Sequence, residues 1–355
     1  MTAQVWTVYI NGQVVPNVQS MNISVGRQSV QDPFRGSTIN VTGRNLSTFV
    51  KPIIGWQIYV YCNSKLIYDG RVANCSIEYG IIPSEDRWNV QGEDALADAG
   101  RAITSTTWAA DTSTYVAAYT AANFTGVSVI NLNAFASSSY CSPQTFVRTN
   151  LLGILQTLAN TEQARLVGAG YTTIGWIGRA GATGVGYICD FTDGTVATTK
   201  PTANYNAVTF ASAADNYATK VVVSPSGLAQ ATAGTGNFVR NFESYDITDA
   251  QAANLAGYIR NTLSVSSTVP SSVSFLSEAE SSDTAITGLA YSNLGASLGV
   301  ILRGTKYNCI MEGFTVSVTP EYARGTAYLS SAEAYSFLTL DDAVYGTLNN
   351  NKLGF

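Results

Sequence analysis

The chain has 355 residues, enough for two or more domains, and hydrophobic residues make up 46% of them. Charged residues make up only 12%, the formal net charge is −5, and no basic run occurs, which excludes tight sequence-independent binding of nucleic acid. The absence of histidine excludes Ser-His-Asp and Cys-His catalysis and histidine metal ligands.

The N-terminal part alternates apolar and polar residues as half-buried strands do. Residues 5–10 form the first predicted strand, and Asn11-Gly12 after it is a strong signal for a hairpin turn. Further short strands are predicted at residues 21–27, 37–43, 56–62, 66–68, 71–79 and 87–91. Strands at this spacing, with Gly, Asn and Pro between them, are typical of an antiparallel barrel or sandwich. A short helix from Glu93 to Gly100 follows.

Two longer helices are predicted in the middle of the chain. The first spans residues 151–165, where apolar residues recur at helical spacing and Thr149 or Asn150 could cap the start. Residues 171–179 and 185–191 are predicted to form a hairpin around a Gly-rich turn. The second helix follows Thr248, which with Gln251 fits a capping box. Its apolar stripe consists of Ala252, Leu255, Ala256, Ile259 and Leu263.

The C-terminal region carries three predicted strands and then loses its periodicity. Strands at residues 300–303 and 307–318 end before Pro320, because a proline cannot donate to a sheet ladder, and a strand from Thr326 pairs with the second of them. The tail beyond is apolar without a pattern: Phe337, Leu338, Leu340, Val344, Tyr345, Leu348, Leu353 and Phe355. These side chains need a covering surface, which either the same domain or a neighbouring subunit could supply. We predict that residues 340–355 dock on another subunit or protein.

The termini and cysteines indicate where the protein is made. The N-terminus lacks the basic segment and apolar core of a signal peptide, and no apolar run is long enough to cross a bilayer. We therefore expect synthesis in a cytoplasm. The five cysteines have no close paired spacing, and we expect reduced, mostly buried thiols at Cys62, Cys75, Cys141, Cys189 and Cys309.

No motif in the sequence assigns a catalytic, cofactor-binding or metal-binding residue. The glycines from Gly178 to Gly186 lack the Lys-Ser/Thr of a phosphate-binding loop and favour a turn. Ser292 does not lie in a nucleophile elbow. Three carboxylate pairs could hold Ca²⁺ or act as glycosidase pairs, but turn or surface roles are favoured: Asp190 and Asp193, Glu278 and Glu280, Asp341 and Asp342. The five tryptophans could bind sugars, but aromatic residues in strands more often form core or interface.

Several strings resemble a known family. Near the N-terminus these are Gly26-Arg27, Phe34-Arg35-Gly36-Ser37-Thr38, Gly43-Arg44-Asn45, Tyr68-Asp69-Gly70-Arg71-Val72 and Gly92-Glu93-Asp94-Ala95-Leu96-Ala97. Near the C-terminus they are Glu312-Gly313-Phe314-Thr315-Val316, Thr319-Pro320, Ala327-Tyr328-Leu329-Ser330 and the ending Lys352-Leu353-Gly354-Phe355. In this order the strings resemble minor tail proteins of long-tailed bacteriophages with non-contractile tails, of the tail-tip or baseplate hub type. The order of features matches over most of the chain, although no single motif is highly specific.

The resemblance implies a mainly β fold with α insertions, built from two antiparallel β-barrel-like hub domains and an extended C-terminal arm. We expect a first barrel domain at residues 1–102 and an insertion domain with one helix and the hairpin at 103–203. A second barrel domain with one helix is expected at 204–335, and the arm at 336–355.

The resemblance also implies a structural, non-enzymatic virion protein without a cofactor. In such a hub, a homotrimer closes the distal end of the tail tube and adapts sixfold to threefold symmetry. It provides the channel for the tape-measure protein and for DNA, which passes without sequence-specific binding. Its partners would be distal tail or tail-tube proteins, the tape-measure protein and tail-tip or fibre proteins. The alternatives are a distal tail protein ring, which forms a hexamer with one barrel per subunit, and a carbohydrate-binding or carboxylate glycosidase virion protein.

Overall fold

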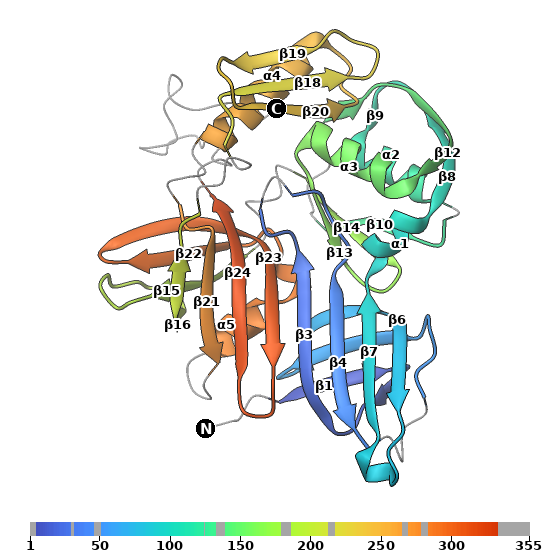
Figure 1. Ribbon diagram of the computed structural model, residues 1–355. Coiled ribbons are helices and arrows are strands. Elements are labelled where there is room, and N and C mark those ends of the chain that lie inside the picture. Colours follow the sequence, from blue (N-terminus) through green and yellow to red (C-terminus); the bar gives the residue numbers. More distant parts are fainter. Residues whose placement is uncertain are drawn as a thin grey trace.

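The computed structural model describes residues 5–29, 32–45, 51–123, 125–132, 139–178, 186–211, 217–264, 269–277 and 283–332. The predicted C-terminal arm and most of the Gly-rich stretch lie outside these ranges. Within them the structure is mainly β with helices between groups of strands, which confirms the predicted fold class (Figure 1).

The N-terminal strands form one antiparallel sheet in the order β3-β4-β7-β6-β5-β1-β2. They are β1 (Trp6–Ile10), β2 (Gln13–Val14), β3 (Val18–Gly26), β4 (Thr38–Arg44), β5 (Gln57–Cys62), β6 (Lys65–Glu78) and β7 (Arg87–Glu93). The predicted turn joins β1 to β2, with positive φ angles of 51° at Asn11 and 76° at Gly12. The long β6 pairs first with β5 and then with β7, with a register shift between Val72 and Asn74, so the sheet folds back over itself.

The C-terminal strands extend this sheet. They are β15 (Tyr187–Thr192), β16 (Thr202–Asn204), β17 (Ala207–Thr209), β21 (Ser272–Ser277), β22 (Ser297–Leu302), β23 (Thr305–Val318) and β24 (Ala323–Ser331). The predicted pairing of the last three strands is confirmed, because β23 pairs with both β22 and β24. β23 also pairs antiparallel with β3, which joins the two halves into a 14-stranded sheet. Among the described strands the hydrogen-bonded path is open and closes no barrel.

One apolar core lies under both halves of the large sheet. Alternate residues of β3 and β4, such as Met21, Ile23 and Val41, enter it from the first half. Phe275 and Phe314 enter it from the second half. The other face of the same strands is therefore left for polar side chains.

A second unit with its own apolar core continues from β7. Its helices are α1 (Ala95–Arg101), α2 (Thr114–Ala122) and α3 (Leu151–Glu162). Its strands are β8 (Ile103–Trp108), β9 (Thr112–Ser113), β10 (Ser128–Asn131), β11 (Tyr140–Cys141), β12 (Gln144–Asn150), β13 (Arg165–Gly168) and β14 (Thr173–Ile177). Asn150 caps α3 as predicted, because its side chain accepts a hydrogen bond from the Gly153 amide at 3.0 Å.

The predicted hairpin of residues 171–179 and 185–191 is wrong. β14 is the middle strand of a three-stranded sheet and pairs with β10 and β13. β15 instead pairs with β16 and β22 of the large sheet. Both strands are largely buried, and each packs into a different apolar core. Burial in these two cores outweighs the local turn signal between the strands.

A small third unit holds β18 (Lys220–Pro225), β19 (Ala231–Gly234), β20 (Val239–Ser244) and α4 (Asp249–Ser264). The predicted capping box is confirmed: the Gln251 amide donates to the Thr248 hydroxyl, and the Gln251 side chain accepts from the Thr248 amide. The predicted apolar stripe of α4 is buried against β18. Two short helical elements, α5 (Asp283–Gly288) and η4 (Tyr291–Asn293), precede β22. The four-part division of the chain into domains stays a prediction.

Candidate functional site

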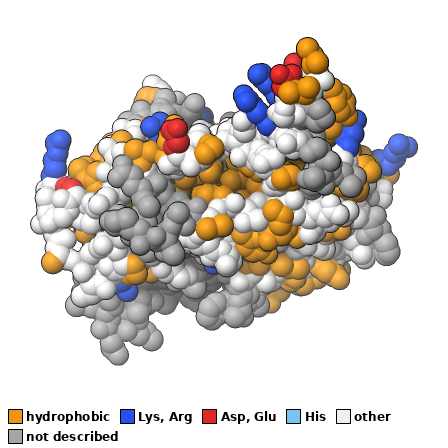
Figure 2. Space-filling view, turned by 90° about the horizontal axis from the view of Figure 1, so that it is seen from below, with side chains coloured by type: hydrophobic (Ala, Val, Ile, Leu, Met, Phe, Trp, Pro, Cys, Tyr) orange, Lys and Arg blue, Asp and Glu red, His pale blue; other side chains and the backbone are white. Residues whose placement is uncertain are grey.

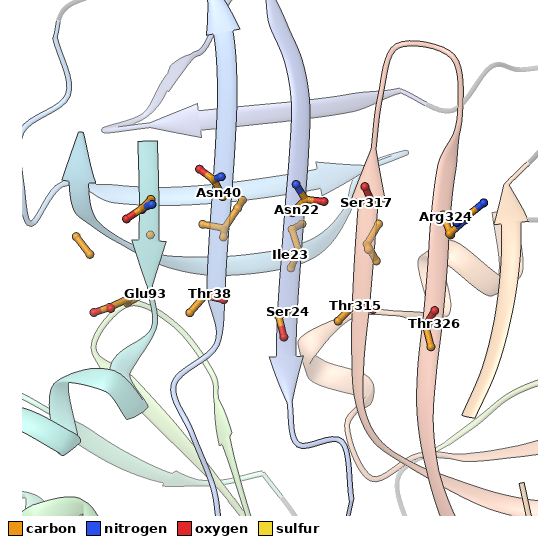
Figure 3. A pocket seen from close by; sticks show the side chains of 15 residues that line it. Asn22, Ile23, Ser24, Thr38, Asn40, Glu93, Thr315, Ser317, Arg324 and Thr326 are labelled. Atoms are coloured by element: carbon orange, nitrogen blue, oxygen red, sulfur yellow. The ribbon is translucent and has the colours of Figure 1, made fainter. Parts of the chain in front are cut away.

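A polar face covers the side of the large sheet that is turned away from the core. Strand register aligns its side chains into rows across β6, β7, β4, β3, β23 and β24. One row contains Asn74, Gln91, Asn40, Asn22, Ser317 and Arg324. The next contains Arg71, Glu93, Thr38, Ser24, Thr315 and Thr326. Figure 3 shows labelled members of both rows on neighbouring strands of β4, β3, β23 and β24.

This polar face is hollowed and almost uncharged. A depression of about 530 Å³ lies over its centre, and only Glu93 and Arg324 carry charge among the residues that line it. Apart from the apolar Ile23, Ile39, Ala73 and Val316, the rest are mostly amides and hydroxyls. Such groups bind water or a passing polar surface without attracting either sign of charge.

A buried carboxylate, Glu312, lies on β23 beyond these rows, where the halves of the sheet meet the second unit. The register shift in β23 between Met311 and Gly313 makes Glu312 an extra residue opposite β24, as in a β-bulge. Its carboxylate accepts hydrogen bonds from Arg165 Nη2 at 2.8 Å, Arg27 Nε at 2.9 Å and the Ser330 hydroxyl at 2.6 Å. Arg27 and Arg165, both distant in sequence, thus meet the β23–β24 hairpin at one anion.

The charges at this junction are nearly removed from water. The side chains of Glu312 and Arg165 are 0% and 4% exposed. Burial alone would raise the pKa of Glu312, but the positive charges of Arg165 and Arg27 hold it well below its usual range. Glu312 is therefore an anion in the folded protein, and its ion pairs hold the large sheet against the second unit. Its lowered pKa is the opposite of the raised pKa that an acid catalyst needs.

Asp190 is also buried, so the turn or surface role predicted for it is wrong. It lies on β15 at 0% exposure and accepts hydrogen bonds from Lys306 at 2.9 Å and from the hydroxyls of Tyr187 and Thr198. Burial opposes ionisation, but these hydrogen bonds lower the pKa of Asp190 below its ordinary value. An acid held ionised in this way ties β15 to β23 and is poorly suited to donate a proton.

Asp193, its predicted partner, is exposed in the turn that was expected for it, where it accepts from the Thr195 amide at 3.0 Å. The other candidate carboxylates, Glu278, Glu280, Asp341 and Asp342, lie outside the described residues. The residues described contain no cluster of three His, Cys, Asp or Glu that could hold a metal ion. No described helix is long and apolar enough to span a membrane.

The remaining sequence predictions concern cysteines and tryptophans. The five cysteines are thiols outside any disulfide, and all except the half-buried Cys75 are buried, as predicted. Trp88, Trp108 and Trp176 are buried in the cores, while Trp6 and Trp56 pack against the core of the large sheet. The tryptophans therefore form core rather than an exposed platform for sugars.

Sequence reasoning missed Glu312 and its two arginines as a site. A charged residue inside the apolar run from Cys309 to Phe314 was the signal that could have found the carboxylate. Its partners lie 285 residues away at Arg27 and 147 residues away at Arg165, and no local pattern points to either.

Comparisons with known proteins show which folds are similar to this one. No protein-family model matches the sequence, and no curated protein matches it. The structure superposes on a 43 kDa tail protein of prophage MuSo2 from Shewanella oneidensis with a TM-score of 0.67 and 13% identity, covering 94% of this chain and 98% of that one. A tail protein from Neisseria meningitidis gives a TM-score of 0.67 at 10% identity, with the same coverage.

The protein has the fold of phage tail proteins. A third structure agrees: a component of the type VI secretion system of Escherichia coli, itself similar to tail proteins gp27 and gp5 of bacteriophage T4. It superposes with a TM-score of 0.52 and 12% identity over 92% of this chain and 77% of that one. The resemblance to phage tail proteins predicted from the sequence is thus confirmed for the fold.

Proposed function

We propose that the chain is a structural, non-enzymatic subunit of the tail-tip or baseplate hub of a long-tailed phage, of the non-contractile type. Three copies form a ring that closes the distal end of the tail tube. The fold shared with prophage tail proteins over 94% of the chain supports a place in a tail. The observation that carries the hub role is the nearly uncharged polar face across both halves of the large sheet.

In this proposal the polar face lines a channel for the tape-measure protein and for DNA, with its strands running from one mouth toward the other. DNA adheres to protein through phosphate contacts with Lys and Arg, and the face offers only Arg324 over its centre. Acidic groups would repel phosphate, and only Glu93 is present there. A wall of amides and hydroxyls lets a polyanion pass with little attraction or repulsion.

The architecture also suits a change of symmetry. The two halves of the sheet lie side by side through the β3–β23 pairing and share one core. A trimer of such chains would present six sheet halves, which suits a sixfold tube on one side and a threefold tip on the other. The partners are then distal tail or tail-tube proteins, the tape-measure protein and tail-tip or fibre proteins. The subunit assembles in the host cytoplasm and is found in the virion.

The first test is the mass of the purified protein by light scattering. A particle of three times the 37.6 kDa chain mass supports the hub. A particle of six times that mass would favour a distal tail ring instead. If the mass is that of one chain, the protein is mixed with tails from a virus whose gene for it is deleted, and failure to join them contradicts the proposal. Hydrolysis of purified cell wall that Asp190→Asn abolishes would contradict the purely structural role.

A further inference from the structure

The eight-residue loop between β6 and β7 presents apolar side chains to solvent. We call residues 79–85, which include the short helix η1 (Pro83–Glu85), the apolar finger. Ile81 is 98% exposed, Tyr79 73% and Ile82 52%. Single exposed apolar residues are ordinary on a protein surface, but three of them on one projecting turn are typical of an interaction site.

Hydrogen bonds fix the conformation of the apolar finger. At its base the buried Asp86 accepts a hydrogen bond from the Gly80 amide at 3.0 Å, which closes the turn. The Glu85 amide donates to the Ile82 carbonyl at 2.9 Å, and the Asn45 amide donates to the Asp86 carbonyl at 3.0 Å. These bonds fix the turn in the conformation that displays its isoleucines, so little ordering is needed when a partner binds.

The position of the finger limits its partners. It extends past the lower end of β6 and β7, at the opposite end of the large sheet from α2, α3 and the small third unit (Figure 1). Figure 2 views the molecule from that end and shows hydrophobic side chains on a projection beside acidic and basic groups. Glu78 and Glu85, both exposed, flank the apolar residues, and together with Asp86 they outnumber Arg87, which lies opposite Glu78 on β7. Acidic groups beside the apolar tip disfavour insertion into an anionic lipid surface.

We propose that the apolar finger inserts into an apolar socket, rimmed by basic groups, on a protein ring stacked against this end of the hub. The inference rests on the proposed function, because it takes the strands of the polar face as running along the channel. A finger that extends along the strands then points at the next ring along the tail. A neighbouring copy within the same ring would instead meet the lateral edges of the sheet.

The test uses purified full-length protein and tails isolated from a virus whose gene for this protein is deleted. Wild-type protein, Ile81→Asp and the control Ile54→Asp are each mixed with these tails, and binding is measured by co-sedimentation. Ile54 is 67% exposed but lies in the segment before β5, away from the finger. We expect Ile81→Asp to bind at least tenfold more weakly and Ile54→Asp to bind as wild type does. Light scattering should give the same mass for all three proteins.

Each other outcome overturns the inference in a recognisable way. If wild-type protein does not bind tails, the proposed function fails and the finger's role with it. If all three proteins bind equally, only the finger's role fails. A mass that changes in Ile81→Asp would place the finger between copies of this chain. Flotation of wild-type protein, but not of Ile81→Asp, with vesicles of phosphatidylethanolamine and phosphatidylglycerol would make it a membrane anchor.

Discussion

At the scale of single residues, two buried carboxylates affect the stability of the folded protein in opposite ways. The folded state favours the charged form of one and disfavours the charged form of the other. Glu312 is compensated by two arginines, so its charge is stabilised in the folded state. Asp94, the N-cap of α1, is also buried, and hydrogen bonds from Ser37 and the Leu96 amide only partly offset the cost of burying its charge. Neutralising each residue should therefore change stability in opposite directions at neutral pH.

The substitution Glu312→Gln should destabilise the protein strongly. It removes the charge that pairs with both the buried Arg165 and the mostly buried Arg27, and removing one partner of a buried ion pair typically costs about 3–5 kcal/mol. Urea unfolding at pH 7 measures the loss, with Glu321→Gln at an exposed position as the control. Equal stability of Glu312→Gln and wild type would show that the ion pairs of Glu312 do not stabilise the fold.

The stability of wild type should also fall in acid because of Glu312. Its pKa is lowered in the folded state, so its contribution is present above the pKa of the unfolded chain and is lost as pH falls toward the folded value. The variant Glu312→Gln has no such carboxylate, and the difference in stability between the two proteins should shrink as pH is lowered. A difference that is independent of pH would argue against an ionic role.

Asp94→Asn should stabilise the protein near pH 7. Burial raises the pKa of Asp94 to about 6, above its ordinary value of 3.8. The folded protein then binds more protons than the unfolded chain between these values, so stability falls as pH rises through this window and levels off above it. The penalty is about 3 kcal/mol when the charge is complete. Asn keeps the N-cap hydrogen bond, so the expected gain appears at pH 7 and vanishes near pH 4.

Calorimetric or urea unfolding across this range checks the Asp94 prediction. Asp98→Asn on the same helix, whose carboxylate pairs with Arg71 near the surface, serves as a comparison that should not stabilise. If Asp94→Asn were less stable than wild type at pH 7, the charged cap would outweigh the cost of its burial.

At the scale of elements, Tyr245 fastens the small third unit to the second unit. Its ring packs against Trp108 and Phe146 at centroid distances of 6.0 Å and 5.9 Å. Its backbone carbonyl accepts from the Ser142 amide at 2.7 Å, and its amide donates to the Thr161 hydroxyl at 2.9 Å. The two units also face each other across two polar crevices that both include Asn160 and Asn241. A contact of this kind permits relative motion of the units.

Tyr245→Ala should loosen the third unit while the large sheet stays folded. Removing the half-buried ring should cost about 2 kcal/mol at this contact, less than a fully buried aromatic residue. Hydrogen exchange should speed up in β20 and in β8, and stay unchanged in β3 and β23. Phe238→Ala, which removes a half-exposed ring of the same unit, is the control. Exchange that rises evenly across all strands would mean that Tyr245 supports the whole fold.

Elements that depend on near neighbours could be predicted from the sequence. The Asn11-Gly12 turn, the Asn150 cap, the capping box at Thr248 and the pairing of β23 with β24 each follow from a signal of a few residues. The fate of β14 and β15 could not, because burial in two separate cores decided it. Pairing of β3 with β23 joins the ends of the chain, and local periodicity carries no information about it.

At the scale of the whole molecule, the polar face exists only because that pairing aligns both halves. The alternation of Asn22 and Ser24 with buried neighbours shows that β3 has a polar side. Nothing in it shows that Asn40, Gln91 and Asn74 continue the same row. The site is thus a property of register across strands that lie far apart in the sequence.

The charge state of this face gives the last prediction, which concerns DNA passage. The double substitution Asn22→Lys and Asn40→Lys adds two cations at the centre of the depression, on neighbouring strands. If the face lines the channel of a trimer, the two cations become six around the DNA, and each phosphate contact strengthens binding in a salt-dependent way.

Virions carrying the variant should assemble but eject DNA at least several-fold more slowly at low salt, with recovery as salt is raised. Ejection is followed by dye binding to released DNA. The control Thr107→Lys and Ser128→Lys adds the same two charges at exposed positions of the second unit and should eject as wild type does. Slow ejection in both the test variant and the control would reflect net charge alone. Normal ejection with Asn22→Lys and Asn40→Lys would contradict the proposal that the polar face lines the channel.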